Sequence, residues 1–238
     1  MANESRIARW AGLTYLLVVA AGFFSLGYVP GKVAAPGNSQ AMLANIVSHE
    51  GLFRAGIGSL MVEQVVFLLL PLLLFLLLGA VNRAVAVALA MATLVATAVP
   101  IALVGVSHRL DALWLLTNPG GLPIESVHAM ASLSLITYDH PIFVANLLWG
   151  LWLLPFGYLV FDSGMLPRVV GVLLILGGTG YLVDVFADLL FPAHADTPSD
   201  YVHLPAALGE IATCLWLLVM GVRSRDERND SGQVESPA

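Results

Sequence analysis

Acidic side chains lie within apolar stretches that are long enough to cross a lipid bilayer. Glu63, Asp184 and Glu210 each lie in a different stretch of this kind. An ionisable group inside a bilayer is costly, so such groups usually serve a function. If these stretches are helices, the acids lie about 9–12 Å below one edge of the bilayer. We expect a polar layer that binds a cation or a small solute, made of Glu63, Asn146, Tyr181, Asp184, Asp188 and Glu210.

Two histidines next to this layer suggest a second chemistry. His140 and His203 each begin an apolar stretch. Imidazole and carboxylate groups together bind Zn, Fe or Mn, and they also suit general acid–base catalysis. A divalent metal is therefore a candidate cofactor, although neither the H-E-x-x-H nor the C-x-x-C spacing of metal motifs occurs. The metal-ligand candidates are His140, His203, Asp184 and Glu210.

Each of these residues also has a purely structural interpretation. A buried carboxylic acid can pack in its protonated form or pair with Arg54 or Arg109 at the rim of a helix bundle. A histidine at a helix end can lie at the membrane interface. The layer as a whole favours a functional cavity, because its members come from several separate stretches of the chain.

The composition of the whole chain places these residues in a membrane. Of the 238 residues, 58% are hydrophobic and only 11% are charged, and the mean hydropathy is +0.86. A soluble domain carries about 25% charged residues, and a disordered chain has low hydrophobicity and high charge. Ten basic against sixteen acidic residues give a net charge of −6, which disfavours nucleic acid as a partner. The expected partner is the lipid bilayer.

Six apolar stretches meet the length of about 20 residues that a membrane span requires. Free backbone groups find no partner in hydrocarbon, so each span must be a helix. The sequence therefore predicts an all-α, polytopic transmembrane helix bundle. Residues 1–223 form a single domain in this prediction, and residues 224–238 form a disordered cytoplasmic tail. The spans are expected at residues 7–29, 55–79, 84–106, 140–161, 168–190 and 204–222.

The distribution of basic residues predicts the orientation of the bundle. With the N-terminus inside, seven arginines lie in inner segments, whereas Lys32, Arg54 and Arg109 lie in outer ones. Cytoplasmic segments of membrane proteins carry the excess of basic residues. We therefore expect a multi-pass protein of the inner membrane with both termini in the cytoplasm.

The expected outer segments contain short helices. Residues 39–49 predict an amphipathic helix that either lies on the membrane surface or caps the bundle. Residues 107–139 contain two apolar pieces, Leu110–Leu116 and Val127–Ile136, separated by Asn-Pro-Gly-Gly. Each piece is too short to span, so both are expected to be interfacial or re-entrant, with a seventh span as the alternative.

Prolines and glycines inside the spans predict how the helices pack. Pro71, Pro100 and Pro155 indicate kinks, or alternatively broken helices that line a cavity. Glycines at positions 150, 157, 177, 178 and 180 favour close helix packing rather than phosphate binding.

Several motifs are absent from the sequence. Lys32 is the single lysine and lies outside the spans, which excludes a retinal-type Schiff base. No G-x-x-x-x-G-K-[ST] motif occurs, so no nucleotide is expected. Cys214 is the single cysteine, so no disulfide can form within the chain.

The second half of the chain resembles a bacterial family of multi-pass membrane proteins known as domain of unknown function 4386. The resemblance is carried by Phe-Asp-Ser-Gly-Met-Leu-Pro-Arg at 161–168, Gly-Tyr-Leu-Val-Asp at 180–184 and Leu-Pro-Ala-Ala-Leu-Gly-Glu at 204–210. The resemblance implies a helical membrane protein and assigns no activity. Asp184 and Glu210 fall inside the resembling motifs, whereas Glu63 and the region of His140 match least.

Three hypotheses for the function follow. The first is a transporter-like or sensory protein whose outward-facing polar cavity binds a cation or a small solute. Six spans are few for a transporter, so this hypothesis calls for a homo-oligomer. The second is an intramembrane metal-dependent hydrolase that uses the cluster of histidines and carboxylates. The third is a structural membrane subunit in which the polar layer serves packing.

Overall fold

The computed structural model describes residues 2–78, 84–191 and 200–222, and these residues form helices and turns without a strand. Six helical stretches among them are long and apolar enough to cross a membrane. The expected all-α membrane bundle is therefore confirmed. The stretches are Glu4–Val33, Glu50–Leu77, Ala90–Thr117, Ile124–Ser163, Arg168–Leu190 and Val202–Val219.

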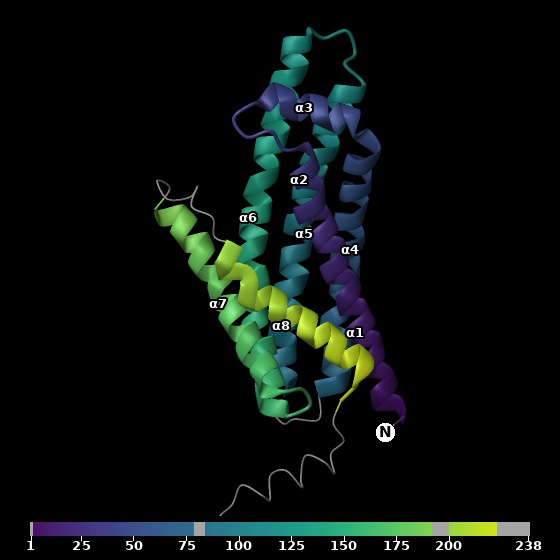
Figure 1. Ribbon diagram of the computed structural model, residues 1–238, viewed down its shortest axis with the longest axis vertical. Helices are drawn as coiled ribbons and strands as arrows, with labels where there is room; N and C mark the ends of the chain where they lie inside the picture. The colour runs from purple at the N-terminus through teal and green to yellow at the C-terminus, as the bar shows by residue number, and fades with distance from the viewer. Residues whose placement is uncertain (1, 79–83, 192–199, 223–238) are drawn as a thin grey trace, which may run out of the picture. The chain divides into compact units, whose positions relative to one another are not determined.

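The helix boundaries follow local signals in the sequence. Helix α3 begins where the side chain of Asn38 accepts a hydrogen bond of 2.9 Å from the amide of Ala41, a typical helix N-cap. Gly164, between α6 and α7, has a φ of 61°, a conformation that favours glycine. The helices are α1 (Ala2–Gly22), η1 (Phe23–Tyr28, a π-helix), α2 (Val29–Val33), α3 (Ser39–Ser48), α4 (Glu50–Leu78), α5 (Ala84–Thr117), α6 (Ile124–Ser163), α7 (Arg168–Leu190) and α8 (Asp200–Val219) (Figure 1).

The segment 107–139 differs from its prediction. Its two apolar pieces are the end of α5 and the beginning of α6, rather than separate interfacial or re-entrant segments. The polar residues before the first piece do not end the helix, because a helix needs a breaker or a cap to stop. The break itself is confirmed, and Gly120 and Gly121 have φ values of 59° and 79° there. The described residues contain no seventh span.

The prolines leave their helices continuous. Helices α4, α5 and α6 continue on both sides of Pro71, Pro100 and Pro155, which supports tolerated kinks over broken helices. Residues 81–83, between the second and third expected spans, and the predicted tail at residues 224–238 lie outside the described residues.

The described residues fall into two compact units. Unit 1 takes its residues from Met1–Leu16, Phe67–Ala96 and Asn146–Ala238, and unit 2 from Leu17–Val66 and Thr97–Ala145. Helices α1, α4, α5 and α6 contribute residues to both units. The single domain expected over residues 1–223 stays a prediction.

Unit 1 is held together by close contacts at glycines. A Cβ atom at Gly157 would come within 2.7 Å of the carbonyl oxygen of Gly171, so α6 and α7 touch through their backbones. A Cβ atom at Gly177 would overlap the backbone of Ala206, which brings α7 and α8 equally close. These contacts confirm that the glycines serve helix packing.

Unit 2 has its own apolar core beneath α3. Leu43 and Ile46 of α3 are 1% exposed, and Leu43 packs with Ala112 of α5 and Ala131 of α6. Helix α3 therefore packs across α5 and α6 of this unit (Figure 1), and its place at the membrane surface stays a prediction. A larger core cluster of the same unit is made of Val29, Val33, Ile46, Phe53, Ile57, Leu60, Val106, Leu113 and Tyr138.

Candidate functional site

Asp184 and His203 form a polar pair between α7 and α8 in unit 1. The Nε2 atom of His203 lies 2.9 Å from the Oδ2 atom of Asp184, and the two share a hydrogen bond. The ring of Tyr181 meets the imidazole edge-on with a centroid distance of 4.4 Å. Close packing at Gly180, whose Cβ would overlap the carbonyl of Val202, holds the two helices near enough for this pair. Three sequence-predicted residues are thus brought together.

Glu210 has a partner from the other end of the chain. The hydroxyl of Tyr15 donates a hydrogen bond of 2.9 Å to the Oε1 atom of Glu210. Tyr15 is fully buried, and its ring packs against Trp152 and Phe156 at centroid distances of 5.9 and 6.0 Å. The aromatic packing fixes the hydroxyl toward the acid, so Glu210 is held by its surroundings rather than open to a ligand on this side.

The other members of the predicted layer differ in their surroundings. Asn146 lies 22 residues after the first residue of α6 (146 minus 124), because α6 begins earlier than the expected span. Among the described residues, neither Asn146 nor Asp188 makes a side-chain hydrogen bond, and both are partly buried. Glu63 belongs to unit 2, is 6% exposed, and packs against Gly22, where an added Cβ would lie 3.4 Å from its carboxyl carbon.

No metal site is found among the residues that the structure describes. They contain no group of three or more His, Cys, Asp or Glu side chains that could hold a metal ion. His203 and Asp184 form a pair, Glu210 is bonded to Tyr15, and His140 is exposed on α6 in unit 2. The hypothesis of a metal-dependent hydrolase is therefore supported by the pair of His203 and Asp184, but the described residues do not provide the third ligand that it needs.

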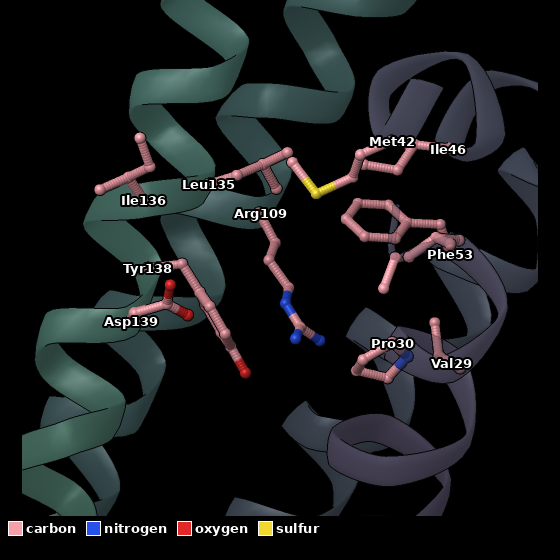
Figure 2. A pocket seen from close by; sticks show the side chains of 12 residues that line it. Val29, Pro30, Met42, Ile46, Phe53, Arg109, Leu135, Ile136, Tyr138 and Asp139 are labelled. Carbon is pink, nitrogen blue, oxygen red and sulfur yellow. The ribbon is translucent and has the colours of Figure 1, made fainter. Parts of the chain in front are cut away.

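Unit 2 contains a pocket that the sequence did not indicate. Its volume is about 180 Å³, and residues of α2, α3, α4, α5 and α6 line it. Most of its walls are apolar, and its polar side chains are Arg109, Tyr138 and Asp139 (Figure 2). The lining consists of Val29, Pro30, Val33, Ala34, Met42, Ile46, Phe53, Arg109, Leu135, Ile136, Tyr138 and Asp139.

Arg109 is the buried cation of this pocket. It is 7% exposed, and its guanidinium carbon lies 3.8 Å from the centroid of the Tyr138 ring. A cation over an aromatic face is attracted by the ring quadrupole, more strongly where water is excluded. Figure 2 shows the guanidinium in the middle of the pocket, between Tyr138 and Pro30.

A gap in the backbone hydrogen bonds of η1 and α2 explains why Arg109 points there. In the π-helix each carbonyl accepts from the amide five residues later, as Phe24 does from Val29. The carbonyl of Ser25 would need the amide of residue 30, which is a proline without an N–H. The Nη1 atom of Arg109 donates to this carbonyl instead, at 3.2 Å.

Sequence reasoning missed Arg109 and Tyr138 as site residues. It placed both in an outer segment, although the spacing of Ala102, Val106, Arg109 and Leu113 matches one face of a helix. That spacing was the available signal. Gln64 was also missed. It is fully buried, and among the described residues its amide group has no hydrogen-bond partner.

Comparison with known proteins places the chain in a family without an assigned activity. An uncharacterized protein of Archaeoglobus fulgidus is 32% identical over 73 residues, which cover 31% of this chain and 41% of that protein. The chain thus spans less than half of that relative. No solved structure matches the chain. The model of the family described as Domain of unknown function (DUF4386) matches residues 10–221, nearly the whole chain. The chain therefore belongs to the DUF4386 family.

Proposed function

We propose that this integral membrane protein is transporter-like or sensory, and that it binds a small amphipathic solute in the pocket of unit 2. The observation that carries the proposal is the pocket itself, which is mostly apolar and has a few convergent polar groups. Pockets of this character are the usual binding sites for small molecules. The cation of the original hypothesis fits this pocket poorly, because Arg109 already supplies a buried positive charge.

The size of the pocket limits what it holds. Its volume of about 180 Å³ is below the roughly 300–1,000 Å³ of sites that enclose a drug-sized ligand. Ile136 lines the pocket and is nevertheless 58% exposed, so the pocket opens beside it. A solute therefore places its polar end and a few carbons inside, and the rest of a longer chain extends out past Ile136.

Photolabelling tests this proposal. The purified protein in lipid nanodiscs is exposed to a decyl alcohol that carries a diazirine, and the labelled residues are mapped by mass spectrometry. We expect labels on pocket-lining residues, and loss of these labels in Met42→Trp, which fills the pocket from α3. Ala44→Trp, on the exposed face of the same helix, is the control and should keep them. Equal labelling of the pocket in wild type and Met42→Trp contradicts the proposal.

We further propose the orientation with both termini in the cytoplasm, at the inner membrane. The excess of arginines in the segments assigned to the inside supports it. The test uses single cysteines in a Cys214→Ala background and a membrane-impermeant maleimide. Asn118→Cys should react in intact cells, whereas Asp162→Cys should react only after permeabilisation. The reverse pattern contradicts the proposed orientation.

A further inference from the structure

Arg109 keeps hydrogen-bond donors that the protein does not use. A guanidinium carries five N–H donors, and among the described residues one hydrogen bond from it is found, to the carbonyl of Ser25. Among the described residues, no Asp or Glu forms an ion pair with Arg109. None of its nitrogens is both fully buried and unpaired, so the remaining donors reach the pocket that Arg109 lines.

Tyr138 positions the guanidinium. The residue is 6% exposed, and its hydroxyl is fully buried, so a ligand in the pocket does not reach that hydroxyl. The centroid of its ring lies 3.8 Å from the guanidinium carbon, and Figure 2 shows the two side by side in the pocket. The aromatic face therefore holds the guanidinium where its donors can meet an oxyanion.

The walls around these donors exclude a free inorganic anion. Val29, Val33 and Ile46 are buried and line the pocket, as does Phe53, whose ring centroid lies 6.0 Å from the guanidinium carbon. An ion such as phosphate would lose its water against these side chains without gaining hydrogen bonds from them. An oxyanion joined to an apolar chain uses the donors and the walls at once.

Asp139 limits the charge of the ligand. Its carboxylate lines the pocket at an exposed position on α6, one residue after Tyr138. A second negative charge on the ligand would be repelled by this carboxylate, with only partial screening by salt. Asp139 also interacts electrostatically with Arg109, so a ligand with one negative charge is repelled less in this pocket than a ligand with two.

We propose that the pocket of unit 2 binds an amphiphile with one negative charge, its oxyanion held by Arg109 on the aromatic face of Tyr138. The inference rests on the proposed function, because it names the chemical class of the solute that the pocket takes. Two sources supply this chemistry, a free alkyl carboxylate and the phosphate of a membrane phospholipid. The small volume favours the free carboxylate, since a phospholipid brings two chains and a bulky headgroup.

Three ligands that differ only in their head group test the charge preference. Decanoate, decanol and decylamine compete with the photoreactive decyl probe at neutral pH in nanodiscs of uncharged lipid. We expect decanoate to bind about tenfold or more tightly than the other two, because hydrogen bonds to a charged group are the strong ones. Equal competition by decanol and decanoate overturns the inference and leaves the proposed function standing. Absence of pocket labelling when the probe is added without a competitor refutes the proposed function itself.

Variants assign the preference to named side chains. Arg109→Gln should weaken decanoate by about tenfold or more and leave decanol unchanged. Tyr138→Leu, which removes the aromatic face against the guanidinium, should weaken decanoate binding by a smaller factor, and Asp139→Asn should strengthen it. Arg54→Gln, which removes an exposed cation of the same unit, is the matched control and should change nothing. Unchanged decanoate binding in Arg109→Gln overturns the inference.

Two further measurements complete the design. If Arg109→Gln does not fold, Arg109→Lys and Tyr138→Leu decide the question, and decanoate binding unaffected in both overturns the inference. For the source of the ligand, a phosphatidylglycerol titration runs beside the decanoate titration in delipidated protein. Displacement of the probe by decanoate alone supports the free carboxylate. Displacement by phosphatidylglycerol at lower concentration also supports the monoanionic amphiphile, with the phospholipid as its source.

Discussion

In unit 1 the acids Asp184 and Glu210 each have a hydrogen-bond partner on another helix, whereas the buried cation of unit 2 has a carbonyl and an aromatic face. No carboxylate among the described residues forms an ion pair with Arg109. The carboxylate oxygens of Asp184 and Glu210 already accept hydrogen bonds from the protein, so they are less available to a ligand than the guanidinium of Arg109. Polar residues in a membrane protein are thus better sorted by their unused hydrogen bonds than by their charge alone.

The largest effect is expected where unit 1 has no room for a side chain. Gly177→Ala should destabilise the protein by about 3 kcal/mol or more, the upper end of the cost of overpacking, because the new methyl overlaps the backbone at Ala206. Gly58→Ala in unit 2 is the control, since nothing lies within 4 Å of its added Cβ. Thermal unfolding in detergent measures both. Equal midpoints would show that α7 and α8 are not in backbone contact.

The bond between Tyr15 and Glu210 predicts the next largest effect. Tyr15→Phe removes the donor and leaves the acid without this partner, which should cost about 1–3 kcal/mol. Tyr158→Phe removes a hydroxyl from a residue that is 39% exposed, so its midpoint should stay near that of the wild type. If Tyr15→Phe and Tyr158→Phe have equal unfolding midpoints, the hydrogen bond from Tyr15 to Glu210 does not stabilise the protein, and the contrast with Arg109 fails.

The pair of Asp184 and His203 should give a smaller energy. Its side chains are 18% and 30% exposed, so each loses less than a fully buried group when its partner is removed. A double-mutant cycle of Asp184→Asn and His203→Ala is expected to give a coupling of about 0.5–1.5 kcal/mol. A coupling of zero would leave Asp184 as free for a ligand as Arg109 is.

The smallest effect is expected at Arg54, the exposed arginine of unit 2, in contrast to the buried Arg109. Arg54 lies at the surface with its Nε atom 2.7 Å from the Oε1 atom of Glu50, four residues earlier on the same helix. Exposed pairs of this spacing contribute below about 0.5 kcal/mol and weaken in salt. Arg54→Ala should therefore shift the unfolding midpoint little, and less at high ionic strength. A large shift would mean that exposed charge stabilises this unit as much as buried charge does.

Most of the fold could be predicted because its signals are local. Length and hydropathy identify the spans, and α7 begins and ends at the expected residues 168 and 190. The extension of α5 and α6 through residues 107–139 was missed because the polar residues there look like a loop in sequence. Arg109 is tolerated in the helix because Ser25 and Tyr138, far away in the chain, provide its partners. The residues next to Arg109 in the sequence do not reveal these partners.

The candidate site was predicted only in part for the same reason. The helical spacing of Tyr181 and Asp184 is visible in sequence, and the structure adds His203 to them. The pocket of unit 2 needs five helices and a proline that leaves a carbonyl unpaired, and these become neighbours only on folding. Acidic residues attract attention in an apolar sequence, whereas a single arginine near a predicted helix end is easily assigned to the rim.

The hydrogen bond between Tyr15 and Glu210 joins residues that are 195 positions apart, and this separation has a consequence for biogenesis. At translation rates of roughly 5–20 residues per second, about 10–40 seconds pass between the synthesis of the tyrosine and that of its acceptor. During that interval the first span has been synthesised, but the hydroxyl of Tyr15 lacks its acceptor on α8. A nascent chain that ends before Glu210 lacks the acceptor of this hydrogen bond, so the contact between the first and the last helix can form only when synthesis is nearly complete.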